Sequence, residues 1–318
     1  MNKLWQQQQF PLQGREQGTA IIVALFLVAV VAAIAINMMA RLNRDIQRTE
    51  LLMNSTQANL YAQGSVAWAM DTLINNWLNQ KKNMVIDRLP LSSPPNTVNH
   101  FQISSTIYDA QAALNLNNLS AEPWTSNFQR LLLLLNPQLG NENAQKITKS
   151  VVNWISSSSS NPDDDQYYLK LAQPYRVSHR LMASVSEFRL IKGVTPQLYS
   201  RLLPYITALP ENTLINVNTA PGPVLQSLSP QLSAESVKII DAIRKQTPFS
   251  SNEQFTNLDP VRNSAVPDGR ITVSSQYFLI KTQVNKNDQH LLLYTLVQRL
   301  AQDKKVSIQV LWQSKGGI

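Results

Sequence analysis

An acidic triplet has the clearest potential for chemistry in this sequence: Asp163, Asp164 and Asp165. Hard oxygen donors in a flexible loop can hold a calcium ion. The triplet closely follows the serine run 156–160, so we expect a long exposed loop over residues 156–165. The spacing does not match an EF-hand, and a solvated acidic turn is the alternative interpretation. The sequence therefore offers calcium as its one candidate cofactor.

Other catalytic patterns are absent from the sequence. The three histidines are far apart and share no metal-ligand spacing: His100, His179 and His290. There is no cysteine, which excludes disulfides, thiol catalysis and cysteine-based zinc sites. No P-loop, GxGxxG, HExxH or GxSxG motif occurs. We therefore expect that the protein is not an enzyme. An anchored enzyme with an unrecognised site is an alternative that no motif supports.

The N-terminal segment offers a different kind of chemistry, proteolytic processing. Residues Thr19–Ala40 form an uncharged stretch of 22 residues, directly after Gly18. A stretch of roughly 20 apolar residues can span a bilayer as a helix. Secretory signals are cut after their apolar core, whereas Gly18–Thr19 lies before it. A cut there would leave the apolar helix on the mature protein, and an uncleaved signal anchor is the alternative. Lys3 and Arg15 favour a cytoplasmic N-terminus.

Periodicity indicates the elements that position these segments. Residues 41–80 are predicted to continue the apolar helix. Along them a stripe of residues spaced three or four positions apart is predicted to pack against the C-terminal part of the chain: Leu42, Ile46, Thr49, Met53, Thr56 and Leu60. Residues 81–97 are expected to form a loop, and His100–Asp109 a strand. Further strands are predicted at Ile271–Lys281, Leu291–Arg299 and Val306–Trp312. One sheet, from residues 81–112 and 267–318, is thus interrupted by an inserted helical domain, residues 113–266.

The inserted domain contains helix-start signals and one segment with a known binding precedent. Caps are predicted at Thr195, at Ser233 and at Ser250 with Glu253. Residues 211–260 resemble a helix-hairpin-helix module, several of which bind DNA phosphates through backbone N–H groups. Here the hairpin, residues 228–232, has no glycine and includes Pro230, and acidic residues outnumber basic ones. A membrane-anchored DNA-binding protein is therefore the second hypothesis, and we expect no nucleic-acid partner. The formal charge of +8 is spread along the chain without a dense basic run.

Several segments together resemble the minor pseudopilin K family of bacterial type II secretion systems. The leader, residues 1–18, is similar to a type IV prepilin leader. The other matching segments are YDAQAALNLNNL (108–119), SVSEFRLIKGVTPQLYSRLLPYITALP (184–210), INVNTAP (215–221) and SSQYFLIKTQV (274–284).

The resemblance implies an α+β, type IV pilin-like fold, a long N-terminal helix on an antiparallel sheet, with the large helical insertion. A prepilin peptidase would cut between Gly18 and Thr19 and methylate the new N-terminus. The mature chain would lie in the inner membrane with its C-terminal domain in the periplasm. It would join minor pseudopilins I and J and other pseudopilins at the tip of the pseudopilus, helping to start assembly and to export folded proteins.

Two positions depart from, or qualify, this resemblance. Most pilins carry Glu at the fifth mature position, which here is Val23. An unpaired carboxylate in an apolar environment is costly, so Val23 suits a subunit with no neighbour above it. In the family an acidic run after a tryptophan is associated with calcium, but here Trp154 is followed by Ile155 and serines. Asp163–Asp165 are the remaining candidate ligands.

Overall fold

A computed structural model describes residues 16–79, 88–158, 162–264, 266, 268–302 and 305–317. Residues 1–15, which include Lys3, Arg15 and most of the predicted leader, lie outside this part of the chain. So do residues 80–87 of the predicted loop and residues 159–161 of the predicted acidic loop. By its internal contacts the chain divides into two units, residues 1–57 and 58–318, and we describe each by itself.

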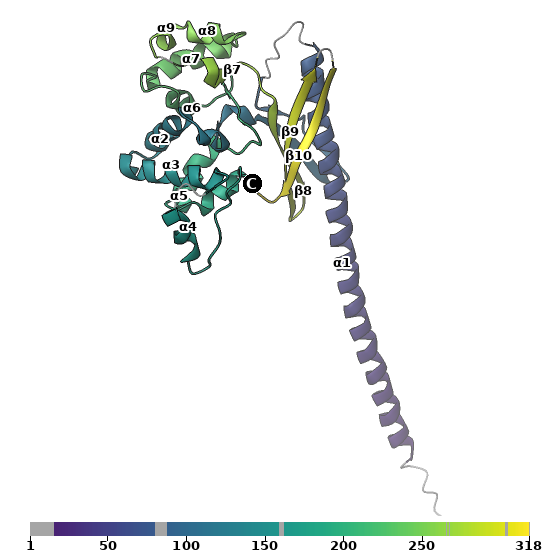
Figure 1. The fold of residues 1–318 in the computed structure, drawn as a ribbon. Helices are drawn as coiled ribbons and strands as arrows, with labels where there is room; N and C mark the ends of the chain where they lie inside the picture. The colour runs from purple at the N-terminus through teal and green to yellow at the C-terminus, as the bar shows by residue number, and fades with distance from the viewer. Residues whose placement is uncertain are drawn as a thin grey trace, which may run out of the picture. The chain divides into compact units, whose positions relative to one another are not determined.

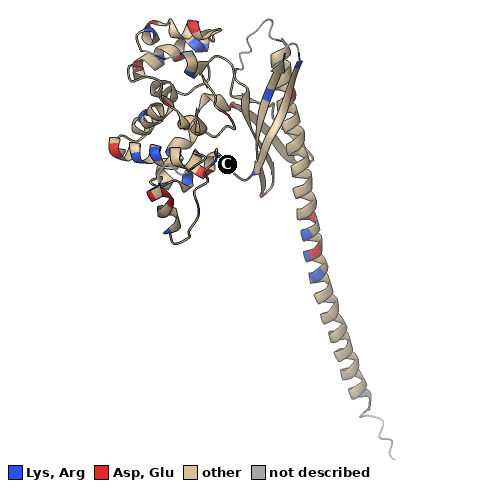
Figure 2. Cartoon of the chain, in the orientation of Figure 1, with Lys and Arg blue, Asp and Glu red and all other residues tan. Residues whose placement is uncertain are grey.

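Helix α1, Glu16–Asn79, contains 64 residues and runs through Gly64 without a break. The first unit consists of the part of α1 up to Gln57, whose side chains are almost all exposed. Figure 2 shows that its apolar segment carries no charge, and that a short band of Arg, Asp and Glu follows. The long N-terminal helix of the predicted pilin-like fold is therefore confirmed.

The part of α1 in the second unit packs against a sheet through small side chains. Its buried residues recur every three or four positions and lie on one face: Ala58, Ala62, Val66, Ala69 and Leu73. The predicted stripe is wrong as a description of this contact, because Leu60 is 64% exposed. Three of the buried residues are alanines, whose small side chains allow the helix to approach the sheet closely, and the predicted stripe contains none of them.

The sheet is antiparallel, in the order β1–β3–β8–β9–β10, with β2 also paired to β3 (Figure 1). The predicted early strand and late meander are present, but the strand expected over Ile271–Lys281 is divided. Ile271 and Thr272 leave the sheet to pair with Ile215 and Asn216, and the sheet strand begins at Tyr277. Two short strands also occur in the predicted 81–97 loop. The strands of the sheet are β1 Leu91–Ser92, β2 Asn96–Val98, β3 Phe101–Asp109, β8 Tyr277–Lys286, β9 Gln289–Gln302 and β10 Lys305–Lys315.

The two faces of the sheet meet different parts of the second unit. Side chains alternate along a strand. Ile107 and Ile280 are paired in register and belong to the core formed with α1. Their neighbours Tyr108 and Leu279 are also paired, and point to the other face, where the inserted helices lie (Figure 1). The sheet therefore separates α1 from the insertion.

The insertion between β3 and β8 has two apolar cores, one formed within residues 114–208 and one within residues 215–273. Thr195 and Ser233 cap their helices as predicted, accepting bonds from the N–H groups of Leu198 and Ser236. The third cap lies one residue later than predicted, because Ser251 accepts from the Gln254 N–H. The helices are α2 Trp124–Leu135, α3 Asn141–Ile155, α4 Pro162–Leu169, α5 Pro196–Leu202, α6 Gly222–Ser227, α7 Ala234–Gln246, α8 Asn252–Thr256 and α9 Asp259–Arg262, with two-residue strands β4 Leu114–Asn115, β5 Ile206–Thr207, β6 Ile215–Asn216 and β7 Ile271–Thr272.

Candidate functional site: the apolar helix and the acidic helix

The apolar segment of α1 has the length and composition of a membrane-spanning helix. Its 22 residues, Thr19–Ala40, extend for about 33 Å at the rise of an α-helix, against a hydrocarbon core of about 30 Å. Bulky side chains such as Phe26 and Val31 are about two-thirds exposed in the isolated chain. An exposed apolar surface of this kind requires lipid or neighbouring subunits to cover it.

The predicted processing residues lie at the start of this helix. Gly18 and Thr19 are both within the first turn of α1 and exposed. A Cβ added at Gly18 would meet no heavy atom within 4 Å, and the backbone there is helical. The fold thus gives no steric reason for glycine at this position. Val23 is one turn further along and is 55% exposed, as a residue in contact with lipid or a neighbouring helix would be.

The acidic triplet lies in a helix, so the predicted long exposed loop is wrong for residues 162–165, whereas residues 159–161 lie outside the described part of the chain. Pro162 begins α4, and Asp163–Asp165 occupy its first turn. Proline at the first helical position and acidic residues in the first turn both favour a helix N-terminus, because they suit its unpaired N–H groups and its dipole. This signal was present in the sequence beside the serine run. Asp164 is only 4% exposed, in contrast to the solvated turn of the alternative interpretation.

The three carboxylates face different partners. Asp164 accepts hydrogen bonds from Ser150 Oγ at 2.6 Å and from Lys192 Nζ at 2.7 Å. Asp165 accepts from Asn153 Nδ2 at 2.8 Å, and its other oxygen lies 3.3 Å from His179 Nε2. Successive residues of a helix diverge by about 100°, which prevents three neighbouring carboxylates from converging.

This arrangement does not fit a calcium ion. Within the described residues, no three acidic or histidine side chains come together in a way that could hold a metal. An ammonium and a serine hydroxyl already contact the two oxygens of the Asp164 carboxylate. Asp163 is exposed. The calcium prediction therefore gains no support from the geometry, and titration remains its test.

Sequence reasoning missed a buried carboxylate, Asp109, where the sheet meets the insertion. One oxygen accepts from the Gln111 N–H at 2.8 Å, and the other accepts from Asn216, Thr219 and Ser275. Burial raises the pKa of Asp109 even though these four donors lower it. These bonds join three of the segments quoted for the resemblance, YDAQAALNLNNL, INVNTAP and SSQYFLIKTQV. In this structure the residues of these segments therefore have a structural role.

The helix-hairpin-helix-like segment is present as α6, a short hairpin and α7. The hairpin hydroxyl of Ser229 accepts from the Gln231 N–H and donates to the Ser264 carbonyl. The one arginine of α7, Arg244, is directed inward to Asp241 and to the Val217 carbonyl. Two arginines from outside the segment lie beside the hairpin, but both donate to carbonyl groups at its start, Arg130 to that of Ser227 and Arg270 to that of Leu228. The hairpin itself, residues 228–232, has no Lys or Arg, whereas a phosphate-binding surface requires a cluster of basic side chains.

Comparison with known proteins supports the same architecture. The family models for type II secretion system protein K match residues 112–211 and 215–274, which together make up half of the chain. The type II secretion system protein K of Pectobacterium carotovorum is 29% identical over 96% of this chain and 98% of its own length. That of Pseudomonas aeruginosa is 28% identical over 95% and 94%. A chain in the crystal structure of the GspK-GspI-GspJ complex from enterotoxigenic Escherichia coli has a TM-score of 0.71 at 23% identity, covering 85% of this chain and all of that one.

A long N-terminal helix with an apolar first half, packed through its second half on an antiparallel sheet, defines a pilin-like subunit, and the helical insertion distinguishes it from a simple pilin. The chain belongs to the type II secretion system protein K family. It is therefore a minor pseudopilin by family.

Proposed function

We propose that this chain acts at the tip of the type II secretion pseudopilus, where it helps to initiate assembly and to export folded proteins across the outer membrane. The observation that carries the proposal is the exposed apolar segment, Thr19–Ala40, directly after Gly18. Such a helix can partition into lipid before assembly and pack against other subunits afterwards.

The subunit would begin as a single-pass protein of the inner membrane with its C-terminal domain in the periplasm. A prepilin peptidase would remove residues 1–18 and methylate Thr19. The helical backbone satisfies its own hydrogen bonds throughout the apolar segment, as a lipid environment demands. The charged band that follows, from Arg41 to Glu50, would lie at or beyond the membrane surface.

Val23 and the size of the insertion support a tip position. A glutamate at Val23 would need a cation to compensate it in an apolar environment, and the subunit at the end of a fibre has no amine above it. The insertion, between Asp109 and Tyr277, is larger than the sheet-bearing part and is bulky for a subunit covered by another.

Minor pseudopilins I and J are the proposed partners, together with other pseudopilins. The similar chain from enterotoxigenic Escherichia coli was solved as the GspK-GspI-GspJ complex. Co-purification of the full-length chain with its candidate minor pseudopilins from membranes tests this. A chain that assembles normally into the middle of fibres would contradict the tip position.

N-terminal sequencing of the membrane-bound protein tests the processing step. We expect the mature chain to begin at Thr19, and Gly18→Ala to block cleavage while the protein stays in the membrane. Gly64→Ala is the matched control, because it makes the same change at another exposed position of α1 where a Cβ also meets nothing. Retention of Met1 in the native protein, or cleavage inside the apolar segment, would refute the proposal.

A gel shift of the full-length protein at low salt tests the DNA-binding alternative. Salt-sensitive binding at micromolar concentration or tighter would revive it.

A further inference from the structure

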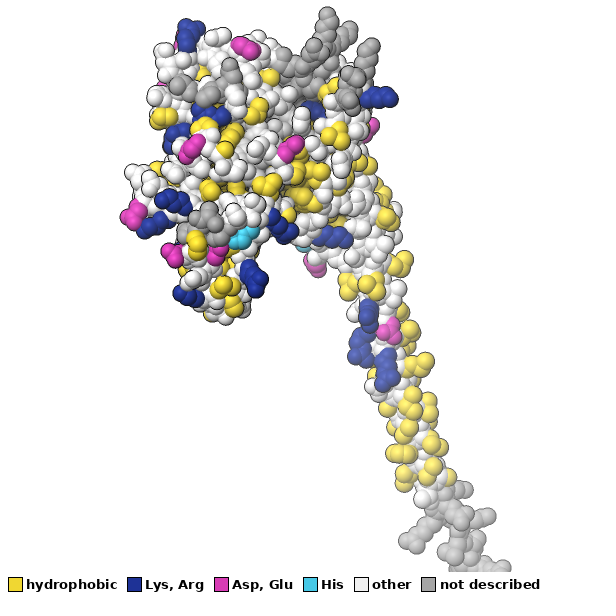
Figure 3. All heavy atoms as spheres, viewed as in Figure 1, with side chains coloured by type: hydrophobic (Ala, Val, Ile, Leu, Met, Phe, Trp, Pro, Cys, Tyr) yellow, Lys and Arg dark blue, Asp and Glu magenta, His cyan; other side chains and the backbone are white. Residues whose placement is uncertain are grey.

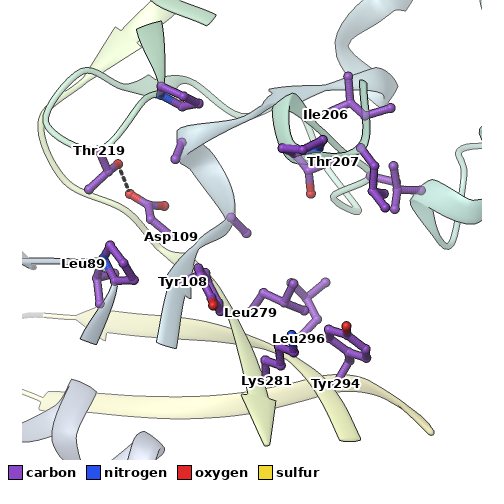
Figure 4. Close-up of a pocket in the computed structure, with 18 of the residues that line it drawn as sticks. Leu89, Tyr108, Asp109, Ile206, Thr207, Thr219, Leu279, Lys281, Tyr294 and Leu296 are labelled. Atoms are coloured by element: carbon purple, nitrogen blue, oxygen red, sulfur yellow. Dashed lines mark hydrogen bonds between the residues drawn. The ribbon is translucent and has the colours of Figure 1, made fainter. Parts of the chain in front are cut away.

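A cavity of about 580 Å³ lies between the sheet and the insertion, within the second unit. This volume is in the range of pockets that bind ligands. Figure 4 shows its two walls, with Lys281, Leu296 and Tyr294 on the sheet side and Ile206 and Thr207 on the insertion side. In Figure 3, hydrophobic side chains gather where the insertion meets the strands.

The sheet wall of the cavity is one apolar row across four strands. The row is formed by residues paired in register, Tyr108, Leu279, Leu296 and Trp312. Lys281 and Tyr294 are paired in the adjacent row of the same face. Because this face points away from α1, the row is not part of the helix–sheet core. It forms an apolar floor with a single ammonium beside it.

The unused polar groups of this wall can all donate hydrogen bonds. The ammonium of Lys281 and the hydroxyls of Tyr108 and Tyr294 have no partner among the described residues. The indole N–H of Trp312 is buried and also lacks an acceptor. Among the described residues that line the cavity the one carboxylate is that of Asp109, and four donors already saturate it. The cavity therefore complements a ligand that is apolar and carries a negatively charged acceptor.

The opposite wall favours a peptide over an acyl chain. Ile206, Thr207 and Ala208 are consecutive and all line the cavity. Side chains of an extended segment alternate, so three consecutive residues can line one surface only if the main chain forms part of it. Ile206 and Thr207 pair with β4 along one edge of β5, and no strand among the described residues pairs with the other edge. A polypeptide can pair with the backbone groups of such an edge, whereas an acyl chain would leave them without hydrogen bonds.

We propose that this cavity binds a segment of a partner protein in which an apolar side chain is followed or preceded closely by Asp or Glu. The apolar side chain lies on the row Tyr108–Leu279–Leu296–Trp312, and the carboxylate meets Lys281 and Tyr294. This interaction is independent of processing at Gly18 and of the tip position.

Selection of a random octapeptide phage library on the full-length protein in lipid nanodiscs tests the proposal. We expect the native protein to enrich peptides with an apolar residue within two positions of Asp or Glu. Lys281→Glu should instead enrich peptides in which Lys or Arg takes the place of the acid. Lys305→Glu is the matched control, since it is an exposed lysine of the same sheet that does not line this cavity, and it should select the native motif.

Binding of one selected peptide, measured by fluorescence anisotropy, then gives the coupling energy between the acidic residue of the peptide and Lys281. Replacing its acidic residue by the amide should weaken binding to the native protein roughly tenfold and leave binding to Lys281→Gln unchanged. Thr207→Trp should block binding by filling the cavity, and circular dichroism checks that each variant is folded. The proposal is overturned if no peptide saturates the native protein, or if Lys281→Glu selects the same motif as the native protein. It is also overturned if Thr207→Trp binds the peptide as well as the native protein does. Binding of dodecanoate that depends on Lys281, without binding of peptides, would likewise overturn it.

Discussion

Removal of Lys192 is expected to destabilise the insertion, because among the described residues this lysine is the one cation that pairs with the buried carboxylate of Asp164. The carboxylate is 4% exposed, and its two oxygens contact Lys192 Nζ at 2.7 Å and Ser150 Oγ at 2.6 Å. Lys192→Met preserves the length and apolar character of the side chain and removes only the ammonium. Asp164 would then keep one hydrogen bond and lose its counter-charge.

The magnitude follows from the burial of the two partners. Breaking a buried ion pair by removing one member costs about 3–5 kcal/mol. The Lys192 side chain is 40% exposed, so solvent already screens the pair and can reach part of the vacated space. We therefore expect a loss of about 2 kcal/mol in the free energy of unfolding. Part of it comes from the contact of the ammonium with the Tyr167 ring, 4.9 Å from its centroid.

A double-mutant cycle with Asp164→Asn separates these contributions. Unfolding of the full-length protein by urea can be followed by tryptophan fluorescence. Trp154 contributes to this signal, and it packs on Tyr168, which lies in α4 together with Asp164. In the Asp164→Asn background, Lys192→Met should lose only its aromatic contact, about 0.5 kcal/mol.

Lys146→Met is the matched control, since its 2.5 Å pair with Glu142 lies on the surface and should contribute nothing measurable. If Lys192→Met lowers the free energy of unfolding by no more than Lys146→Met does, the view that burial, rather than the distance between the charges, decides the strength of these ion pairs is refuted.

Three further predictions concern other positions. Gly64→Ala should raise the free energy of unfolding by about 0.8 kcal/mol, because Gly64 is an exposed interior position of α1; a decrease would show that this helix needs glycine there. Asp109→Asn should lower the free energy of unfolding by about 1–3 kcal/mol, because the new amide N–H group would face the N–H donor of Asn216. Burial raises the pKa of Asp109 above its ordinary 3.8, so the free energy of unfolding of the native protein falls as the pH rises from about 4 through the raised pKa. The deficit of the variant should narrow over the same rise in pH. Urea titrations of both proteins measure this, and a deficit that widens would contradict it. Isothermal titration with calcium should give no heat and no change in melting temperature, whereas saturable heat would restore Asp163–Asp165 as ligands.

Signals that are local in sequence predicted the fold best. The uncharged stretch after Gly18, the caps Thr195 and Ser233, and the alternation in Phe101–Asp109 each act within a few residues of the chain. Their physical causes, desolvation of the backbone, unpaired N–H groups and side-chain alternation, do not depend on distant partners. The strand–insertion–strand order followed from them.

Features that depend on distant partners could not be predicted in this way. Asp109 is buried by residues more than 100 positions away, and nothing in its neighbourhood distinguishes it from a surface aspartate. The alanines of α1 form part of the contact face because sheet residues such as Ile107 and Ile280 pack against them. At Asp163–Asp165 two local signals adjoin: the serine run, which favours a loop, and Pro162 with the following acidic residues, which favour the start of a helix.

The adjacent pairing of β3 and β8 has a consequence for how the chain acquires its fold. Asp109 and Phe278 are partners in register although the whole insertion separates them. Closing a loop of roughly 170 residues costs about 3 kcal/mol more free energy, from lost conformational entropy, than closing a tight turn. The hairpins β8–β9 and β9–β10 need no such closure. They should therefore form early, and β3 should join them only when the insertion has collapsed and brought its two ends together, so that slow folding of the insertion would delay completion of the sheet.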